Sequence, residues 1–237
     1  MIARKLTTVA ALAYLAITPA ALALPSLSVV HSEATAQAEA PPGEHEFMDA
    51  QAIEDSALDL TPAQRHEIIR LYEISAGKGY AMAHHNLGVW YHYGIGTNVD
   101  YHKAFDHYLA AAQLGFAGAM NNLGDMYESG QGVHQSYGDA IRWYASAAEQ
   151  GEPVAHYSLG SLYLTGKGVR QDYAEAAFWL QIALKRMPQG QNREATITSL
   201  NEALRQLSNE EAEFVSKRIE QWEPLVMAAD IMSDRIK

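Results

Sequence analysis

A period of 36 residues constrains the fold of this chain more than any other feature of its sequence. Nine positions recur at this interval in three consecutive copies, without an insertion or a deletion. Units of this length stack on their neighbours because one unit alone cannot bury its apolar face, so the period predicts a solenoid. The recurring positions are Ala83, Ala119 and Ala155; Leu87-Gly88, Leu123-Gly124 and Leu159-Gly160; Tyr91, Tyr127 and Tyr163; Gly94, Gly130 and Gly166; Gly96, Gly132 and Gly168; Tyr101, Tyr137 and Tyr173; Ala104, Ala140 and Ala176; and Ala111, Ala147 and Ala183.

Each unit divides into two helices. In the first unit Ala83, Leu87 and Tyr91 follow one another at four-residue steps, which places an apolar stripe along one helix face. The Gly-x-Gly segment that follows ends this helix, because glycine adopts positive φ without steric cost. A second helix begins near Tyr101 and carries small alanines that allow close packing. We therefore predict an all-α fold, an α/α superhelical repeat solenoid of 36-residue helix-turn-helix units over residues 81–186, with helical caps at both ends.

The sequence on either side of the repeats predicts these caps. Residues 60–80 are in phase with the second helix of a unit, so we expect a lone N-terminal capping helix, a half repeat, opened by a capping box at Thr61–Gln64. The phase is lost after the third unit, and residues 187–237 are expected to form a C-terminal helical cap. In this cap we predict one helix over 192–207 and a second opened by a capping box at Ser208–Glu211.

The N-terminus has the three-part pattern of a secretory signal peptide. Arg4 and Lys5 precede an apolar run over Leu6–Ile17, and the small residues around Ala23 form a cleavage site. We predict a signal peptide over residues 1–23 and a periplasmic or secreted product with no membrane span after cleavage, since the run is shorter than a spanning helix. Residues 24–59, rich in Ala, Ser, Glu and Pro, are expected to form a flexible linker, with one weak helix near Phe47–Leu58.

The repeated motif resembles the Sel1-like repeat family of tetratricopeptide-like α/α solenoids. The resemblance is fullest in the second unit, and the first unit departs from it at Thr97, in place of Val, and at His107, in place of Trp. The resemblance implies an adaptor or scaffold that binds another protein or peptide. The second unit carries the motif as Leu123-Gly124, Tyr127, Gly130, Gly132-Val133, Tyr137, Ala140, Trp143-Tyr144, Ala147-Ala148 and Gly151.

The resemblance also raises an enzymatic alternative. Some members of an exported, cysteine-rich subgroup of this family are described as penicillin-binding or weakly β-lactam-hydrolysing, but this chain has no cysteine. The sequence Ser75-Ala76-Gly77-Lys78 matches the Ser-x-x-Lys motif of serine acyl enzymes, in which the lysine activates the serine. Ser75 is in phase with the packing position Ala111, and neither Ser-Asp-Asn nor Lys-Thr-Gly follows. We therefore assign no catalytic residue and keep a cell-wall or β-lactam hydrolase as the alternative function.

Charge and residue spacing exclude further classes of function. The net charge of −11 argues against a nucleic-acid partner, because few cations would be available to neutralise phosphates. His85 and His92 are seven residues apart and share a helix face, but no third ligand is fixed by spacing, so no metal and no cofactor is assigned.

The helix face opposite the buried stripe is the predicted binding surface. It lies about 180° around each first helix, and a stack of units would present it as one concave surface suited to a partner polypeptide. A purely structural role in assembling an envelope complex remains a third option. Unlike the core positions, the residues on this face differ from unit to unit: they are His85, Val89, His92, Asn121, Asp125, Glu128, Tyr157, Ser161 and Leu164.

Overall fold

The structure is a computed structural model that describes residues 40–57, 59–187 and 193–222. The predicted signal peptide over 1–23 therefore lies outside the described residues, as do residues 24–39 of the predicted linker. Within the described ranges the chain forms ten α-helices and no strand. These helices are α1 (Glu44–Asp55), α2 (Pro62–Gly77), α3 (Ala81–Tyr93), α4 (Tyr101–Gln113), α5 (Ala117–Ser129), α6 (Tyr137–Glu149), α7 (Pro153–Thr165), α8 (Tyr173–Arg186), α9 (Arg193–Leu204) and α10 (Asn209–Gln221).

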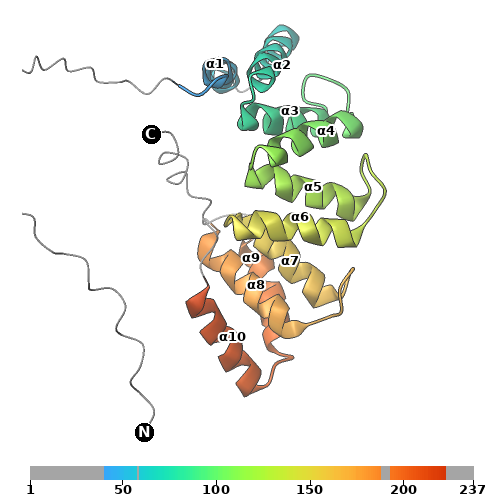
Figure 1. Cartoon of the computed structure of the whole chain (residues 1–237), viewed down its shortest axis with the longest axis vertical. Helices are drawn as coiled ribbons and strands as arrows, with labels where there is room; N and C mark the ends of the chain where they lie inside the picture. The colour runs from blue at the N-terminus through green and yellow to red at the C-terminus, as the bar shows by residue number, and fades with distance from the viewer. Residues whose placement is uncertain (1–39, 58, 188–192, 223–237) are drawn as a thin grey trace, which may run out of the picture. The chain divides into compact units, whose positions relative to one another are not determined.

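Consecutive helices pack in pairs, and the pairs stack in chain order. In the three repeats α3 packs with α4, α5 with α6 and α7 with α8, and the second helix of each pair also contacts the first helix of the next. The three loops that carry the Gly-x-Gly segments lie on the same side of the stack (Figure 1). These contacts confirm the all-α repeat solenoid predicted from the 36-residue period.

The structure corrects the predicted linker over 24–59 and the lone capping helix over 60–80. Helix α1 packs against α2, so the first element of the stack is a helix pair and not a half repeat. The buried ring of Phe47 lies 5.5 Å from that of Tyr72 and 5.1 Å from that of Tyr80, measured between centroids. Gly43 precedes α1 with φ of 89° and lies one period before Gly79, whose φ is 85°. The helix pair α1–α2 is thus a divergent unit whose register the glycines preserve.

Glycines inside the first helices set the distance between the two helices of each repeat. A Cβ atom on Gly88 would lie 2.5 Å from the ring of Tyr108, and one on Gly124 would lie 2.4 Å from the ring of Tyr144. In the third repeat Gly160 faces Leu180 at 2.6 Å. The Leu-Gly motif therefore marks the place where a large side chain of the second helix crosses the backbone of the first.

The Gly-x-Gly turns connect neighbouring units as well as neighbouring helices. Gly132 has φ of 73°, and a Cβ atom there would lie 2.5 Å from the carbonyl oxygen of Tyr101 in the preceding second helix. One period later, a Cβ atom on Gly168 would lie 2.2 Å from the Cβ atom of Tyr137. The glycines at this position combine left-handed backbone with tight packing, which no other residue provides without strain.

The C-terminal helices cap the last repeat as predicted, with slightly different bounds. Both α9 and α10 pack against α8, and the capping box at Ser208 and Glu211 opens α10. The guanidinium of Arg218 in α10 pairs with Glu175 and lies 3.9 Å from the ring centroid of Phe178. In the ranges that the structure covers, no helix combines the length and apolar character needed to cross a membrane.

The glycine–tyrosine contact predicts a large difference between two Gly→Ala variants. Gly124→Ala is expected to destabilise the chain by about 1–3 kcal/mol, because the added methyl group overlaps the ring of Tyr144. Gly138→Ala, in α6, has no heavy atom within 4 Å of the added Cβ and is expected to be neutral or to stabilise by up to about 1 kcal/mol. Urea unfolding of both variants followed by circular dichroism measures the difference, and equal stabilities would contradict the packing described.

Candidate functional site

The nine predicted partner-binding residues, called the variable face below, differ in exposure. Asp125 is exposed, and six others are half-buried. Asn121 and Leu164 are buried, with 6% and 7% of their surfaces exposed. The side chain of Leu164 packs in the core formed with the C-terminal cap, so it is not available on the surface. The helical spacing that placed Leu164 on the variable face does not include the effect of α9 and α10.

In the first repeat the variable face is aromatic. The ring of His85 lies 4.8 Å from that of Phe116 between centroids, and its Nε2 is 3.1 Å from the amide nitrogen of Asn122 in α5. His92 lies 5.3 Å from the ring of Tyr101, edge to face. Burial lowers the pKa of both histidines, which keeps them neutral near pH 7. Both side chains are therefore neutral and half-buried and pack against other rings, and His85 also faces Asn122 of the next unit.

These histidines do not form a metal site with their neighbours. Across the described ranges, no group of three or more His, Cys, Asp or Glu side chains is placed to hold a metal ion. A different histidine pair, His84 and His107, has its Nδ1 atoms 3.2 Å apart. Burial, with repulsion from His84 adding to it, lowers the pKa of His107 to about 4. The substitution of His107 for the family's Trp thus produces a neutral histidine contact between α3 and α4.

In the second repeat the variable face contains two carboxylates around one tyrosine hydroxyl. The Oη atom of Tyr144 lies 2.6 Å from Asp125 Oδ1 and 3.0 Å from Glu128 Oε2. The amide nitrogen of Asn121 lies 3.4 Å from Asp125 Oδ2 and donates a weak hydrogen bond to it. We call these four residues, Asn121, Asp125, Glu128 and Tyr144, the acidic cluster. Tyr144 reaches it from α6, where its ring, 1% exposed, crosses Gly124.

The acidic cluster changes the ionisation of Asp125. Although Asp125 is exposed, protein surrounds its carboxylate closely enough for burial to raise its pKa to about 6. The hydrogen bond from Tyr144 lowers this pKa, and repulsion from Glu128 raises it. Burial also raises the pKa of Tyr144, and the charge of Asp125 adds to that effect, so the hydroxyl keeps its proton.

Sequence reasoning placed Tyr144 in the repeat motif but not in the site. A signal for it is present in the sequence, since Tyr108 and Tyr144 each follow the glycine of the Leu-Gly motif at the same spacing. A tyrosine ring that crosses such a glycine brings its hydroxyl to the far side of the first helix, beside the variable face. In the third repeat Leu180 takes this position, so no hydroxyl reaches Tyr157 or Ser161 in the same way.

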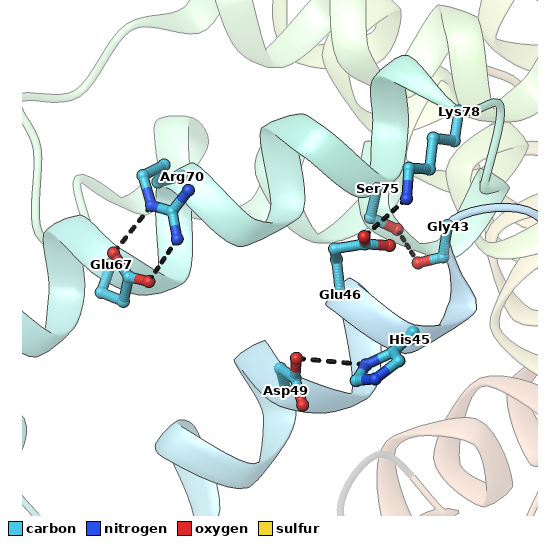
Figure 2. Close-up of polar contacts among 8 residues, drawn as sticks. All are labelled: Gly43, His45, Glu46, Asp49, Glu67, Arg70, Ser75 and Lys78. Atoms are coloured by element: carbon cyan, nitrogen blue, oxygen red, sulfur yellow. Dashed lines mark hydrogen bonds and ion pairs between the residues drawn. The ribbon is translucent and has the colours of Figure 1, made fainter.

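The Ser75–Lys78 pair does not have the geometry of a serine acyl enzyme. Ser75 is fully buried, and its hydroxyl donates a 2.6 Å hydrogen bond to the carbonyl oxygen of Gly43. Lys78 Nζ lies 2.5 Å from Glu46 Oε1, so the ammonium pairs with α1 and not with the serine (Figure 2). Both side chains attach α1 to α2. The Ser-x-x-Lys motif is therefore a structural contact at the N-terminal end of the stack.

The raised pKa of Asp125 predicts a pH-dependent loss of stability. The folded chain binds this proton more tightly than the unfolded chain, in which the pKa is near 3.8, so ionisation of Asp125 weakens folding as pH rises from about 4 to about 6. Asp125→Asn should therefore stabilise the chain at about pH 7.5, by less than about 1 kcal/mol because the group is partly exposed, and should have little effect below about pH 4.

Thermal unfolding of the wild type and Asp125→Asn at both pH values measures this effect. Carbon-detected NMR titration of the Asp125 carboxyl group gives its pKa directly, and Glu128→Gln should lower that pKa by removing the repulsion. A carboxyl group that titrates at its ordinary value in the wild type would contradict the environment described for the cluster.

Comparison with known proteins agrees with this architecture. The Sel1 repeat family model matches residues 81–116, 117–152 and 153–186, which are the helix pairs α3–α4, α5–α6 and α7–α8. None of the curated proteins compared with the chain is close enough to count as a relative.

Two solved structures share the fold. A protective antigen of uropathogenic Escherichia coli strains that displays an SLR fold has a TM-score of 0.67 and 26% identity over 82% of this chain. The match covers 41% of the antigen, so this chain spans less than half of its length. A Sel1 repeat protein from Oxalobacter formigenes has a TM-score of 0.60 and 21% identity, over 76% of this chain and 74% of that protein. Residues 81–186 of the chain are therefore three consecutive members of the Sel1 repeat family.

Proposed function

We propose that this protein is an exported adaptor that binds an extended segment of a partner protein along its variable face. Sel1 repeat solenoids commonly serve as scaffolds for protein interactions. One observation carries the proposal: the repeats keep the same residues where they pack and different residues on the variable face.

The contrast is visible within single turns of the first helices. Leu87, Leu123 and Leu159 occupy one position of the three repeats, and all are buried. Two residues further on, the same helices carry Val89, Asp125 and Ser161, none of which is buried. Packing therefore dictates the first position, whereas the fold accepts three unrelated side chains at the second. Packing does not determine the residue types on this surface, so the binding of a partner can determine them.

The chemistry of the variable face also changes in order along the stack. The first repeat presents half-buried histidine rings, the second presents the carboxylates of Asp125 and Glu128, and the third presents Tyr157 and Ser161. Because each unit contacts only its neighbours, successive units meet successive parts of a bound chain. An extended polypeptide with an apolar, a basic and again an apolar portion matches this order.

Loss of the variable-face side chains should abolish partner binding. Affinity capture from an envelope extract would compare the wild type with a variant in which Asp125, Glu128 and Tyr157 are changed to Ala. We expect at least one protein to be retained stoichiometrically by the wild type and lost by the variant, since a few central residues carry most of an interface's energy.

The matched control removes two carboxylates and one ring from exposed positions elsewhere, by changing Asp106, Glu149 and Phe214 to Ala. This control should retain the same partner, and all three proteins should have the same helical circular dichroism. Equal capture by the wild type and the variable-face variant would argue against the proposed surface.

Export is the second part of the proposal, and it rests on the N-terminal sequence. We expect the protein recovered from the envelope or the medium to begin at Leu24, as determined by N-terminal sequencing and intact mass, because the signal peptide is removed after Ala23. Leu12→Arg, which interrupts the apolar run, should leave the uncleaved chain in the cytoplasm. A wild-type chain that stays cytoplasmic with Met1 in place would contradict export while leaving the adaptor role open.

A further inference from the structure

We infer that the acidic cluster binds a basic side chain, a lysine or an arginine, of the partner segment. This inference rests on the proposed function, because it names the chemistry of the group that the variable face receives in its second repeat.

The carboxylates of the cluster are not paired with a cation. Among the described residues, other acidic side chains form ion pairs, for example Glu46 with Lys78 and Glu175 with Arg218. Neither Asp125 nor Glu128 takes part in any ion pair that the described residues form. Two like charges beside one hydroxyl repel each other, and a cation placed between them would relieve this repulsion.

The hydrogen bonds of the cluster are also incomplete. Tyr144 lies within hydrogen-bonding distance of both Asp125 and Glu128, but its hydroxyl has a single proton to donate. At neutral pH, ionised carboxylates are acceptors only, so one of the two contacts with Tyr144 lacks a hydrogen. The cluster therefore has more acceptor atoms than protons, and a donor from outside the chain would pair with the acceptors that remain.

Asn121 provides an independent sign that a donor is missing. Its amide nitrogen faces Asp125, which fixes the orientation of the amide because a carboxylate cannot donate. The other atom of the amide, Oδ1, is buried and has no hydrogen-bond partner. A buried acceptor without a partner is unfavourable, and a donor that enters the cluster beside Asn121 would supply one. This amide belongs to a side chain that is only 6% exposed.

A basic side chain supplies what the cluster lacks. Lysine presents three N–H donors and arginine five, and neither has an acceptor at its charged end. A metal ion fits the site less well, because the described residues place no third acidic or imidazole ligand beside Asp125 and Glu128. The rings of His85 and Phe116 in the preceding part of the face would contact apolar atoms of the same segment.

A peptide selection tests this inference. Random peptides of about 12 residues, displayed on phage, would be selected in parallel on the full chain and on its Asp125→Asn, Glu128→Gln variant. Peptides selected on the wild type should share a lysine or arginine at one position, and those selected on the variant should not. The control variant Asp106→Asn, Glu149→Gln loses the same two charges from α4 and α6 and should select the same basic position as the wild type.

A double-mutant cycle then measures the contact itself. One selected peptide would be compared with its norleucine or citrulline analogue, against the wild type and the Asp125→Asn, Glu128→Gln variant, by fluorescence anisotropy. We expect the neutral analogue and the variant each to weaken binding about tenfold, with little further loss when both are combined. Independent, additive losses would overturn the contact between the basic side chain and the cluster.

The remaining outcomes separate this inference from the proposed function. Peptides that lose affinity for Tyr157→Ala but show no basic preference would overturn the inference and keep the variable face as a binding surface. Peptides that are insensitive to Tyr157→Ala and to the acidic cluster alike would contradict both. Binding that requires added Ca²⁺ or Mg²⁺ and disappears with EDTA would assign the cluster to a cation and overturn the inference.

Discussion

The crossing of a tyrosine ring over a helix glycine links the packing of this solenoid to its surface chemistry. At Gly88 and Gly124 the missing side chain lets the rings of Tyr108 and Tyr144 pack closely against the first helix. The ring buries apolar surface in the core, and the side chain is long enough to place its hydroxyl on the far side of the first helix. The same contact that holds α5 against α6 therefore delivers the Tyr144 hydroxyl to Asp125 and Glu128.

Much of the fold could be predicted from the sequence because each repeat position occurs three times. An assignment made in one unit is therefore checked by the equivalent residues of the other two. The bounds of α3 to α8, the capping boxes at Thr61 and Ser208 and the all-helical class were predictable from phase and capping alone. Helix α1 was predicted only as a weak helix over 47–58 within a linker, because it lacks the Leu-Gly and Tyr positions of the motif and keeps only Gly43 in phase. Its stability comes from the contacts of Phe47 with α2 and Tyr80, which no local pattern reveals.

The candidate site was predictable in position but not in detail. Helical spacing identified Asp125 and Glu128 as neighbours on one face, and the structure places them around one hydroxyl. Spacing along one helix does not show which residues a neighbouring helix covers. The burial of Asn121 and Leu164 could therefore be recognised only in the tertiary structure. The same limit applies to Ser75, where the motif matched an enzyme signature and the fold uses the hydroxyl as a buried donor to Gly43.

The acidic cluster is not a requirement of the repeat. The position of Asp125 is occupied by Val89 in the first repeat and by Ser161 in the third, and all three first helices form with the same length. Burial raises the pKa of Asp125, which means that the ionised carboxylate works against folding rather than for it. A scaffold that would accept a neutral side chain at this position instead carries a poorly solvated charge beside a second carboxylate. Stability does not explain why this position carries a carboxylate. Recognition of a basic group does, because a bound cation offsets the poor solvation of Asp125 and its repulsion from Glu128.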